Sequence, residues 1–149
     1  MHKFLAVLMA MLFLLSGCAA NRVAQRQVID YPEHYSQFDA ALGWEVKKTP
    51  NDLIVDGAIK NLRFYEMTDI EVWVETLDPA GKVLSRQVSF IIPRTVMQDE
   101  SAPFSVRLPR SAYANRLRFT YKYTGEEGGN DEGGGDLRGF QSFEAPIQR

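Results

Sequence analysis

The chain has one thiol, Cys18, which makes it the first side chain to consider for chemistry. It follows an apolar stretch from Phe4 to Leu15, which begins after Lys3 and ends at Ser16 and Gly17. A positively charged start, a short apolar run and small residues at its end are typical of a secretory signal peptide. The run is too short to cross a bilayer core, which needs about 20 apolar residues. Because a single cysteine forms no intramolecular disulfide, the thiol is available for another modification.

Acid–base catalysis needs a base with a nucleophile and an orienting group, or a carboxylate pair in a cleft. Of the two histidines, His2 lies in the predicted signal peptide and His34 lies in a polar segment that we predict to be a tether. Zinc sites need paired cysteines or clustered histidines, which the sequence does not contain. We therefore expect a protein that is not an enzyme and that holds no metal or other cofactor.

The segment 125–136 is rich in glycine and acids, and it is the one stretch that could supply oxygen ligands to calcium. Its acidic and amide side chains include Asn130, Asp131, Glu132 and Asp136. The spacing is neither that of an EF-hand nor that of a repeated calcium-binding array. Such a segment buries too little apolar surface to offset its ordering entropy, so we expect a solvated loop and leave calcium binding open.

Three basic residues, Arg116, Arg118 and Lys122, have the same parity along one predicted strand. They would lie on one face of a sheet, because side chains alternate along a strand. Such a row could bind an anionic glycan, a lipid headgroup or an acidic partner, or it could be a solvated face. Trp73 and Leu77 on another predicted strand are possible apolar neighbours of this row.

Short runs of alternating apolar and polar residues fill the chain after Trp44, and this pattern is typical of an all-β domain. Leu117, Phe119, Tyr121 and Tyr123 alternate with polar residues, so each strand should have one buried and one wet face. We predict an immunoglobulin-like antiparallel sandwich of about seven strands. The predicted strands are Trp44–Thr49, Leu53–Leu62, Asp69–Leu77, Lys82–Ile92, Pro103–Leu108, Arg116–Tyr123 and Arg138–Ala145.

Turn residues separate these runs. Asp78-Pro79-Ala80-Gly81 has the residue preferences of a β-turn and predicts a hairpin. Pro93 and Pro109 should each close a strand, because proline cannot donate to a ladder. Tyr113 has the place of the corner tyrosine of immunoglobulin-like sandwiches, whose hydroxyl bonds to backbone, and this would make it structural.

The chain therefore divides into three parts: a signal peptide at 1–17, a tether at 18–43 and one β domain at 44–149. A short amphipathic helix around Pro32–Leu42 is an alternative for part of the tether, because Tyr35, Phe38 and Leu42 have helical spacing. The formal net charge is -2 with both signs scattered, which does not support nucleic-acid binding.

Leu15-Ser16-Gly17-Cys18 resembles the lipobox of bacterial lipoproteins. The resemblance implies that the signal peptide is cut before Cys18, that diacylglycerol is joined to its thiol and that its new amino group is acylated. Two or three acyl chains anchor far more firmly than one. In such lipoproteins an aspartate after the cysteine favours retention in the inner membrane, whereas this chain has Ala19. The resemblance thus implies the outer membrane, on its periplasmic side.

Residues from about Trp44 to Tyr123 resemble the FxLyD type of bacterial envelope domain. The resemblance rests on Val55–Asn61, on Ile70–Val83 and on Ser101–Pro109, which includes a Phe-x-Val strand. It implies a small immunoglobulin-like sandwich and assigns no catalytic residues.

Together these observations predict a lipid-anchored lipoprotein of the cell envelope, held to the membrane through Cys18. We expect its sandwich to be a non-catalytic interaction or scaffold module for an envelope protein. The alternative is a binder of an anionic envelope glycan or lipid, using the row Arg116, Arg118 and Lys122. The partner and the oligomeric state do not follow from the sequence.

Overall fold

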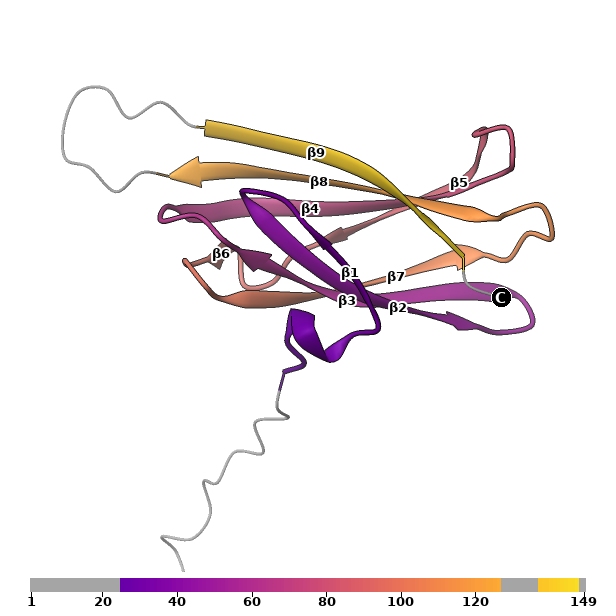
Figure 1. The fold of residues 1–149 in the computed structure, drawn as a ribbon, viewed down its shortest axis with the longest axis horizontal. Coiled ribbons are helices and arrows are strands. Elements are labelled where there is room, and N and C mark those ends of the chain that lie inside the picture. Colours follow the sequence, from indigo (N-terminus) through magenta and orange to yellow (C-terminus); the bar gives the residue numbers. More distant parts are fainter. Residues whose placement is uncertain (1–24, 127–136, 148–149) are drawn as a thin grey trace, which may run out of the picture.

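A computed structural model describes residues 25–126 and 137–147, which form two antiparallel sheets packed face to face (Figure 1). The first sheet has the order β1-β2-β3-β7, and the second has the order β5-β4-β8-β9, with β6 paired to β4. The predicted all-β, immunoglobulin-like sandwich is thus confirmed. The strands are β1 (Glu33–Ser36), β2 (Ala40–Lys48), β3 (Asp52–Asn61), β4 (Glu66–Leu77), β5 (Val83–Phe90), β6 (Thr95–Val96), β7 (Ser101–Pro109), β8 (Arg116–Glu126) and β9 (Leu137–Pro146).

Each of the seven predicted strands corresponds to one of these, and two short strands, β1 and β6, were not predicted. The helix considered for Pro32–Leu42 is wrong, because this segment forms β1 and the start of β2. Its helical spacing arises by chance within a hairpin, whose strands pair Tyr35 with Leu42. The sandwich therefore begins before residue 44, and His34 lies in β1 rather than in a tether.

A short 3-10 helix, η1 (Val28–Asp30), precedes β1 and packs on the outer side of the first sheet. Gly43 of β2 makes this possible, because a Cβ added there would lie 2.2 Å from the carbonyl oxygen of Val28. Arg26 also stabilises this helix through a cation–π contact, because its Cζ lies 4.0 Å from the centre of the buried Tyr31 ring.

Side-chain alternation builds the core between the sheets. Leu117, Phe119 and Tyr121 of β8 are fully buried, whereas Arg118 and Lys122 point outward, as their parity predicted. The remaining core comes from the inner faces of β2, β3, β4 and β7.

A column of aromatic rings joins the two sheets on the side of β1 and β9. Tyr35 stacks on Phe143 with ring centroids 3.6 Å apart, and Phe143 stacks on Phe119 at 5.0 Å. Trp44 of β2 adds a tilted contact with Phe119 at 4.7 Å. Each such ring buries roughly 150–250 Å², so this column contributes much of the cohesion between the sheets.

Two glycines in the strands leave room for core rings of neighbouring strands. A Cβ added at Gly57 would lie 2.3 Å from the Phe104 ring, and one at Gly139 would lie 2.1 Å from the Tyr123 ring. Both pairs face each other directly in the ladders. The rings therefore lie across the backbone of the next strand, which no larger residue would allow.

The predicted hairpin at residues 78–81 is confirmed. The amide of Gly81 donates to the carbonyl oxygen of Asp78 at 2.9 Å, and Gly81 adopts a φ of +83°. This left-handed conformation favours glycine, since other side chains are strained there.

The structure differs from the predictions for the turn after β7 and for the glycine-rich segment after β8. Tyr113 is 77% exposed in the turn after β7, so the predicted corner, with its hydroxyl tucked onto backbone, is wrong. β8 continues to Glu126, so the predicted glycine-rich loop does not begin at Gly125, and its remainder at 127–136 lies outside the described residues. Cys18 and the predicted signal peptide also lie outside them.

Candidate functional site

The outer face of the second sheet carries all three residues of the predicted basic row. Arg116, Arg118 and Lys122 come from β8, and their neighbours come from β5, β4 and β9. The structure thus brings the row together on one solvent-facing surface, which we call the outer face of the second sheet.

Acidic residues of the neighbouring strands pair with the two arginines of this row. Arg118 contacts Glu75 of β4 at 3.3 Å and Glu144 of β9 at 2.8 Å, and Arg116 contacts Glu144 at 2.7 Å. Arg86 of β5 forms a second ion pair with Glu75. The result is a chain of alternating charges across four strands, which lowers the positive potential of the row.

The pKa values of Arg118 and Glu144 shift in the directions that this pairing requires. The hydrogen bond to Glu144 raises the pKa of Arg118, and the same bond lowers the pKa of Glu144. Glu75 is almost fully buried, with 7% of its side chain exposed, so its two arginine partners are what satisfies it. Arg86 and Arg118 therefore have a structural role, which is to pair with the buried Glu75 carboxylate.

Lys122 has different surroundings. Its Nζ lies 5.3 Å from the centre of the Trp73 ring, while the Trp73 Nε1 donates to Glu71 at 2.7 Å. A cation at this distance from an indole is attracted by the π face. Lys122 and Glu71 thus both contact the Trp73 indole. The prediction that Trp73 lies beside the basic row is confirmed. Leu77, the other predicted neighbour, pairs with Arg116 in the ladder of β4 and β8, but it is fully buried and adds no apolar surface beside the row.

A hollow of about 440 Å³ opens at this point of the outer face. Its walls include the Trp73 ring, the cations of Arg86 and Lys122, and Phe140 of β9, which is 60% exposed. The hydroxyls of Thr120 and Ser142 lie 3.0 Å apart at its polar side. Aromatic rings beside cations and hydroxyls can bind an anionic or hydroxyl-rich ligand, but they supply no nucleophile with its base.

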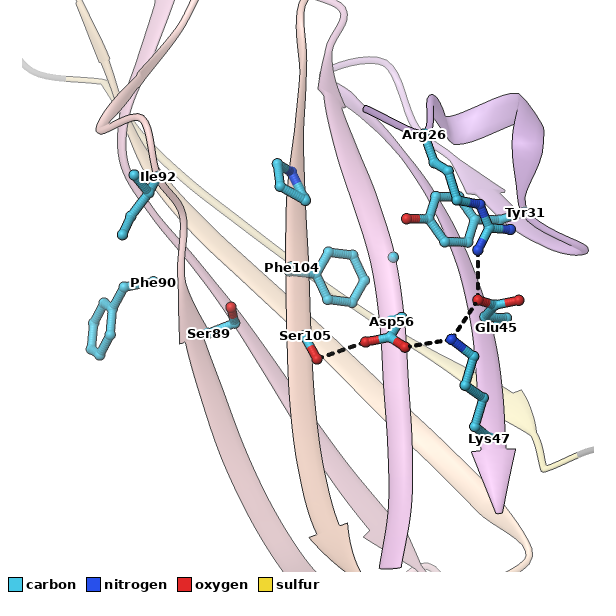
Figure 2. Close-up of a pocket in the computed structure, with 12 residues that line it drawn as sticks. Arg26, Tyr31, Glu45, Lys47, Asp56, Ser89, Phe90, Ile92, Phe104 and Ser105 are labelled. Carbon is cyan, nitrogen blue, oxygen red and sulfur yellow. Dashed lines mark hydrogen bonds and ion pairs between the residues drawn. The ribbon is translucent and has the colours of Figure 1, made fainter. Parts of the chain in front are cut away.

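A second groove, of about 520 Å³, runs over the outer side of the first sheet to the end of β5 (Figure 2). An ion chain occupies one wall: Glu45 accepts from Arg26 at 2.5 Å and contacts Lys47 at 3.1 Å, and Lys47 contacts Asp56 at 2.9 Å. Ser105 of β7 donates to Asp56 at 2.6 Å (Figure 2).

The pKa values in this groove follow the same contacts. The Arg26 hydrogen bond lowers the pKa of Glu45. Burial alone would raise the pKa of Asp56, but hydrogen bonds from Ser105 and Lys47 outweigh it and lower that pKa. The carboxylates are therefore stabilised as anions, which fits a wall that fixes η1 and the strands rather than a proton-transfer site.

A buried polar cluster lies at the β1–β2 hairpin, and the sequence did not reveal it. Asp39 is 1% exposed and accepts hydrogen bonds from the hydroxyls of Tyr121 at 2.7 Å and Tyr123 at 3.1 Å. The Tyr65 hydroxyl lies 3.2 Å from that of Tyr123. Burial is the main cause that raises the pKa of both Tyr121 and Tyr123 far above its ordinary value. Because solvent does not reach these groups, the cluster is structural.

His34, the histidine considered for catalysis, is exposed on β1 with its Nε2 3.0 Å from the Val28 carbonyl oxygen. Within residues 25–126 and 137–147, no group of histidine, cysteine, aspartate and glutamate side chains is arranged to hold a metal ion. No helix among these residues is long and apolar enough to span a membrane.

The fold defines an immunoglobulin-like β-sandwich with a cationic and aromatic hollow on one face. No family model matches the chain, and no curated protein matches it. The resemblances to lipoproteins and to the FxLyD domain therefore stay predictions.

Proposed function

We propose that the protein is a lipoprotein of the bacterial envelope, anchored through lipid on Cys18, whose sandwich is a non-catalytic interaction module in the periplasm. The anchor is supported by the sequence Leu15-Ser16-Gly17-Cys18 after the apolar run. The interaction role is supported by one observation above others: the outer face of the second sheet exposes aromatic rings around a hollow. Interfaces are enriched in aromatic residues and arginine, which this face combines.

The arrangement of these rings defines where a partner would bind. Phe90 of β5 and Phe140 of β9 are 66% and 60% exposed. The ladders place them in one row across the sheet, separated by Glu71 and Lys122. Trp73 lies in the next row. A protein partner would bury the rings and cover the charges between them, as the centre and rim of an interface require.

The anchor is tested by the intact mass of the protein from a host that processes lipoproteins, with Cys18→Ser as the comparison. We expect the wild type to begin at Cys18 and to carry the mass of its acyl chains, and to fractionate with the outer membrane. A soluble wild type of unmodified mass would refute the anchor.

The interaction role is tested by a photo-reactive residue placed at Phe140 in living cells. The matched control places it at Phe64, which is 65% exposed on the loop between β3 and β4. We expect a discrete adduct with an envelope protein from position 140 and none from position 64. Equal labelling from both positions, or none from either, would contradict this site.

A second candidate function is binding of an anionic glycan or lipid at the same hollow, supported by the Lys122 cation beside Trp73. Because Glu144 already pairs with Arg116, the three basic residues should not contribute equally. Lys122→Gln should abolish retention on anionic vesicles or polysaccharide, and Arg116→Gln should change it little. An equal loss from both variants would point to nonspecific charge attraction.

A further inference from the structure

Two loops at one end of the sandwich expose aromatic rings. Phe38 lies in the turn between β1 and β2, Phe64 lies in the loop between β3 and β4, and each is 65% exposed. The amide of Leu62 donates to the carbonyl oxygen of Asp39 at 2.9 Å, which joins the two loops. We call Phe38, Arg63 and Phe64 the aromatic tip. Its rings line neither the hollow nor the groove described above, and neighbouring exposed rings of this kind mark a contact with a protein or a membrane.

The cation of the tip lies among aromatic rings rather than beside a carboxylate. The Arg63 Cζ lies 5.8 Å from the centre of the Phe38 ring, 5.5 Å from that of Phe64 and 5.2 Å from that of Tyr65. Its Nε has no hydrogen-bond partner, and none of the ion pairs in the described part of the chain includes it. A bilayer interface suits this combination, because aromatic rings enter the boundary between headgroups and acyl chains while a cation meets the phosphates.

A methionine adds apolar surface at the same end. Met97, which is 44% exposed, lies in the loop between β6 and β7. The Asp99 amide of this loop donates to the carbonyl oxygen of Asn61 at 2.9 Å, so the loop lies beside the end of β3 that leads into the tip. The two acids of the loop already have partners: Asp99 pairs with Lys60 at 3.0 Å, and Glu100 accepts from the Met97 amide at 3.1 Å.

The first described residue lies at this end as well. The Nε2 of Gln25 donates to the carbonyl oxygen of Ser101 at 3.1 Å. Ser101 pairs with Lys60 near the end of β3, from which the aromatic tip follows. If Cys18 carries the lipid, as proposed above, Gln25 lies at most roughly 25 Å from the lipidated residue. The anchor therefore holds this end of the sandwich close to the bilayer, which raises the effective concentration of lipid at the tip.

We propose that the aromatic tip contacts the bilayer that holds the lipid of Cys18, an inference that rests on the proposed anchor. The rings of Phe38 and Phe64 enter the boundary between headgroups and acyl chains, and the Arg63 guanidinium lies at the level of the phosphates. The loops go no deeper, because their backbone polar groups need water. A single anchor leaves a domain free to rotate, and this second contact fixes which end of the sandwich touches the lipid.

The contact is tested with the acylated protein in vesicles of phosphatidylcholine with a quarter of phosphatidylglycerol, after its intact mass has established the acyl chains. Because the Cys18 thiol is then bonded to lipid, an introduced cysteine is the one free thiol for a fluorescent dye. A dye at Phe64→Cys should be quenched by lipids with nitroxide groups on their acyl chains. The control is Tyr113→Cys, which is 77% exposed between β7 and β8 at the other end of the sandwich. We expect its quenching to be about threefold weaker.

A second reporter shows whether the rings themselves make the contact. With the dye at Met97→Cys, the change Phe38→Ser with Phe64→Ser should lower the quenching by about threefold, because the apolar surface that enters the lipid is lost. The matched control is Phe90→Ser with Phe140→Ser, which removes two rings of similar exposure, 66% and 60%, from the outer face of the second sheet. This control should leave the quenching unchanged. All four side chains are exposed, so the melting curves of both double variants should match that of the wild type.

Three outcomes would overturn the proposal. Equal quenching at positions 64 and 113, or quenching at position 97 that survives Phe38→Ser with Phe64→Ser, would refute the contact and leave the anchor intact. A dye at position 64 that is shielded both from the lipid nitroxides and from a water-soluble quencher would show that a protein covers the tip instead. A protein without acyl mass would refute the anchor and this inference together, so the two failures are distinguishable.

Discussion

Replacing Tyr121 by phenylalanine tests whether the buried cluster at Asp39 stabilises the sandwich. The change removes the hydroxyl that donates to Asp39 at 2.7 Å and leaves the ring in the core. Asp39 keeps the Tyr123 hydroxyl at 3.1 Å and the Ala40 amide at 2.9 Å. Removing one hydrogen-bond donor from a buried acceptor lowers the free energy of unfolding by about 1–3 kcal/mol. We therefore expect Tyr121→Phe to lower the free energy of unfolding by about this amount.

Urea unfolding followed by tryptophan fluorescence measures the effect. The midpoint should fall while the slope with urea stays unchanged, because the same surface is exposed on unfolding. Tyr113→Phe is the matched control: its side chain is 77% exposed, so its effect should stay within about 0.5 kcal/mol.

A double-mutant cycle assigns the energy to the contact itself. Asp39→Ala removes the acceptor, so the further change Tyr121→Phe should cost about 1 kcal/mol less than it does in the wild type. Additive effects of Asp39→Ala and Tyr121→Phe, or a Tyr121→Phe variant as stable as Tyr113→Phe, would refute the reasoning.

Three further predictions concern packing and titration. Gly57→Ala should destabilise the fold by about 1–3 kcal/mol, because the added Cβ would overlap the Phe104 ring; chemical denaturation measures this, and an unchanged midpoint would contradict it. Gly43→Ala should release η1 from the first sheet and speed tryptic cleavage after Arg26, while the midpoint of the sandwich changes little. The free energy of unfolding should fall as the pH rises above about 10, the ordinary pKa of tyrosine. Above this pH the unfolded chain loses the protons of Tyr121 and Tyr123, whereas the folded protein keeps them because their pKa values are raised. A flat free energy of unfolding between pH 9 and 11 would contradict this.

The strands could be predicted because alternation is a local signal. Runs such as Leu117–Tyr123 show their buried and wet faces in the sequence itself, and the outward parity of the basic row follows from it. β1 was missed because four residues are too few to show a period, and its spacing with Phe38 and Leu42 imitates a helix.

The contacts of the candidate site could not be predicted, because they depend on the register between strands distant in sequence. Nothing in the sequence pairs Glu75 with Arg118 or Glu144 with Arg116; the ladders of β4, β8 and β9 bring them together. The same holds for Asp39, which lies in a polar stretch and reaches two tyrosines more than 80 residues away.

The position of η1 gives the molecule a direction. Since η1 packs on the first sheet, the first described residues, from Gln25 on, lie on that side of the sandwich. If Cys18 carries the lipid, residues 18–27 can reach at most roughly 33 Å from it when fully extended. The first sheet would then be the side of the sandwich nearer the lipid, and the hollow beside Trp73 would lie on the side further from it. A partner at that hollow would approach from the periplasmic space rather than along the membrane.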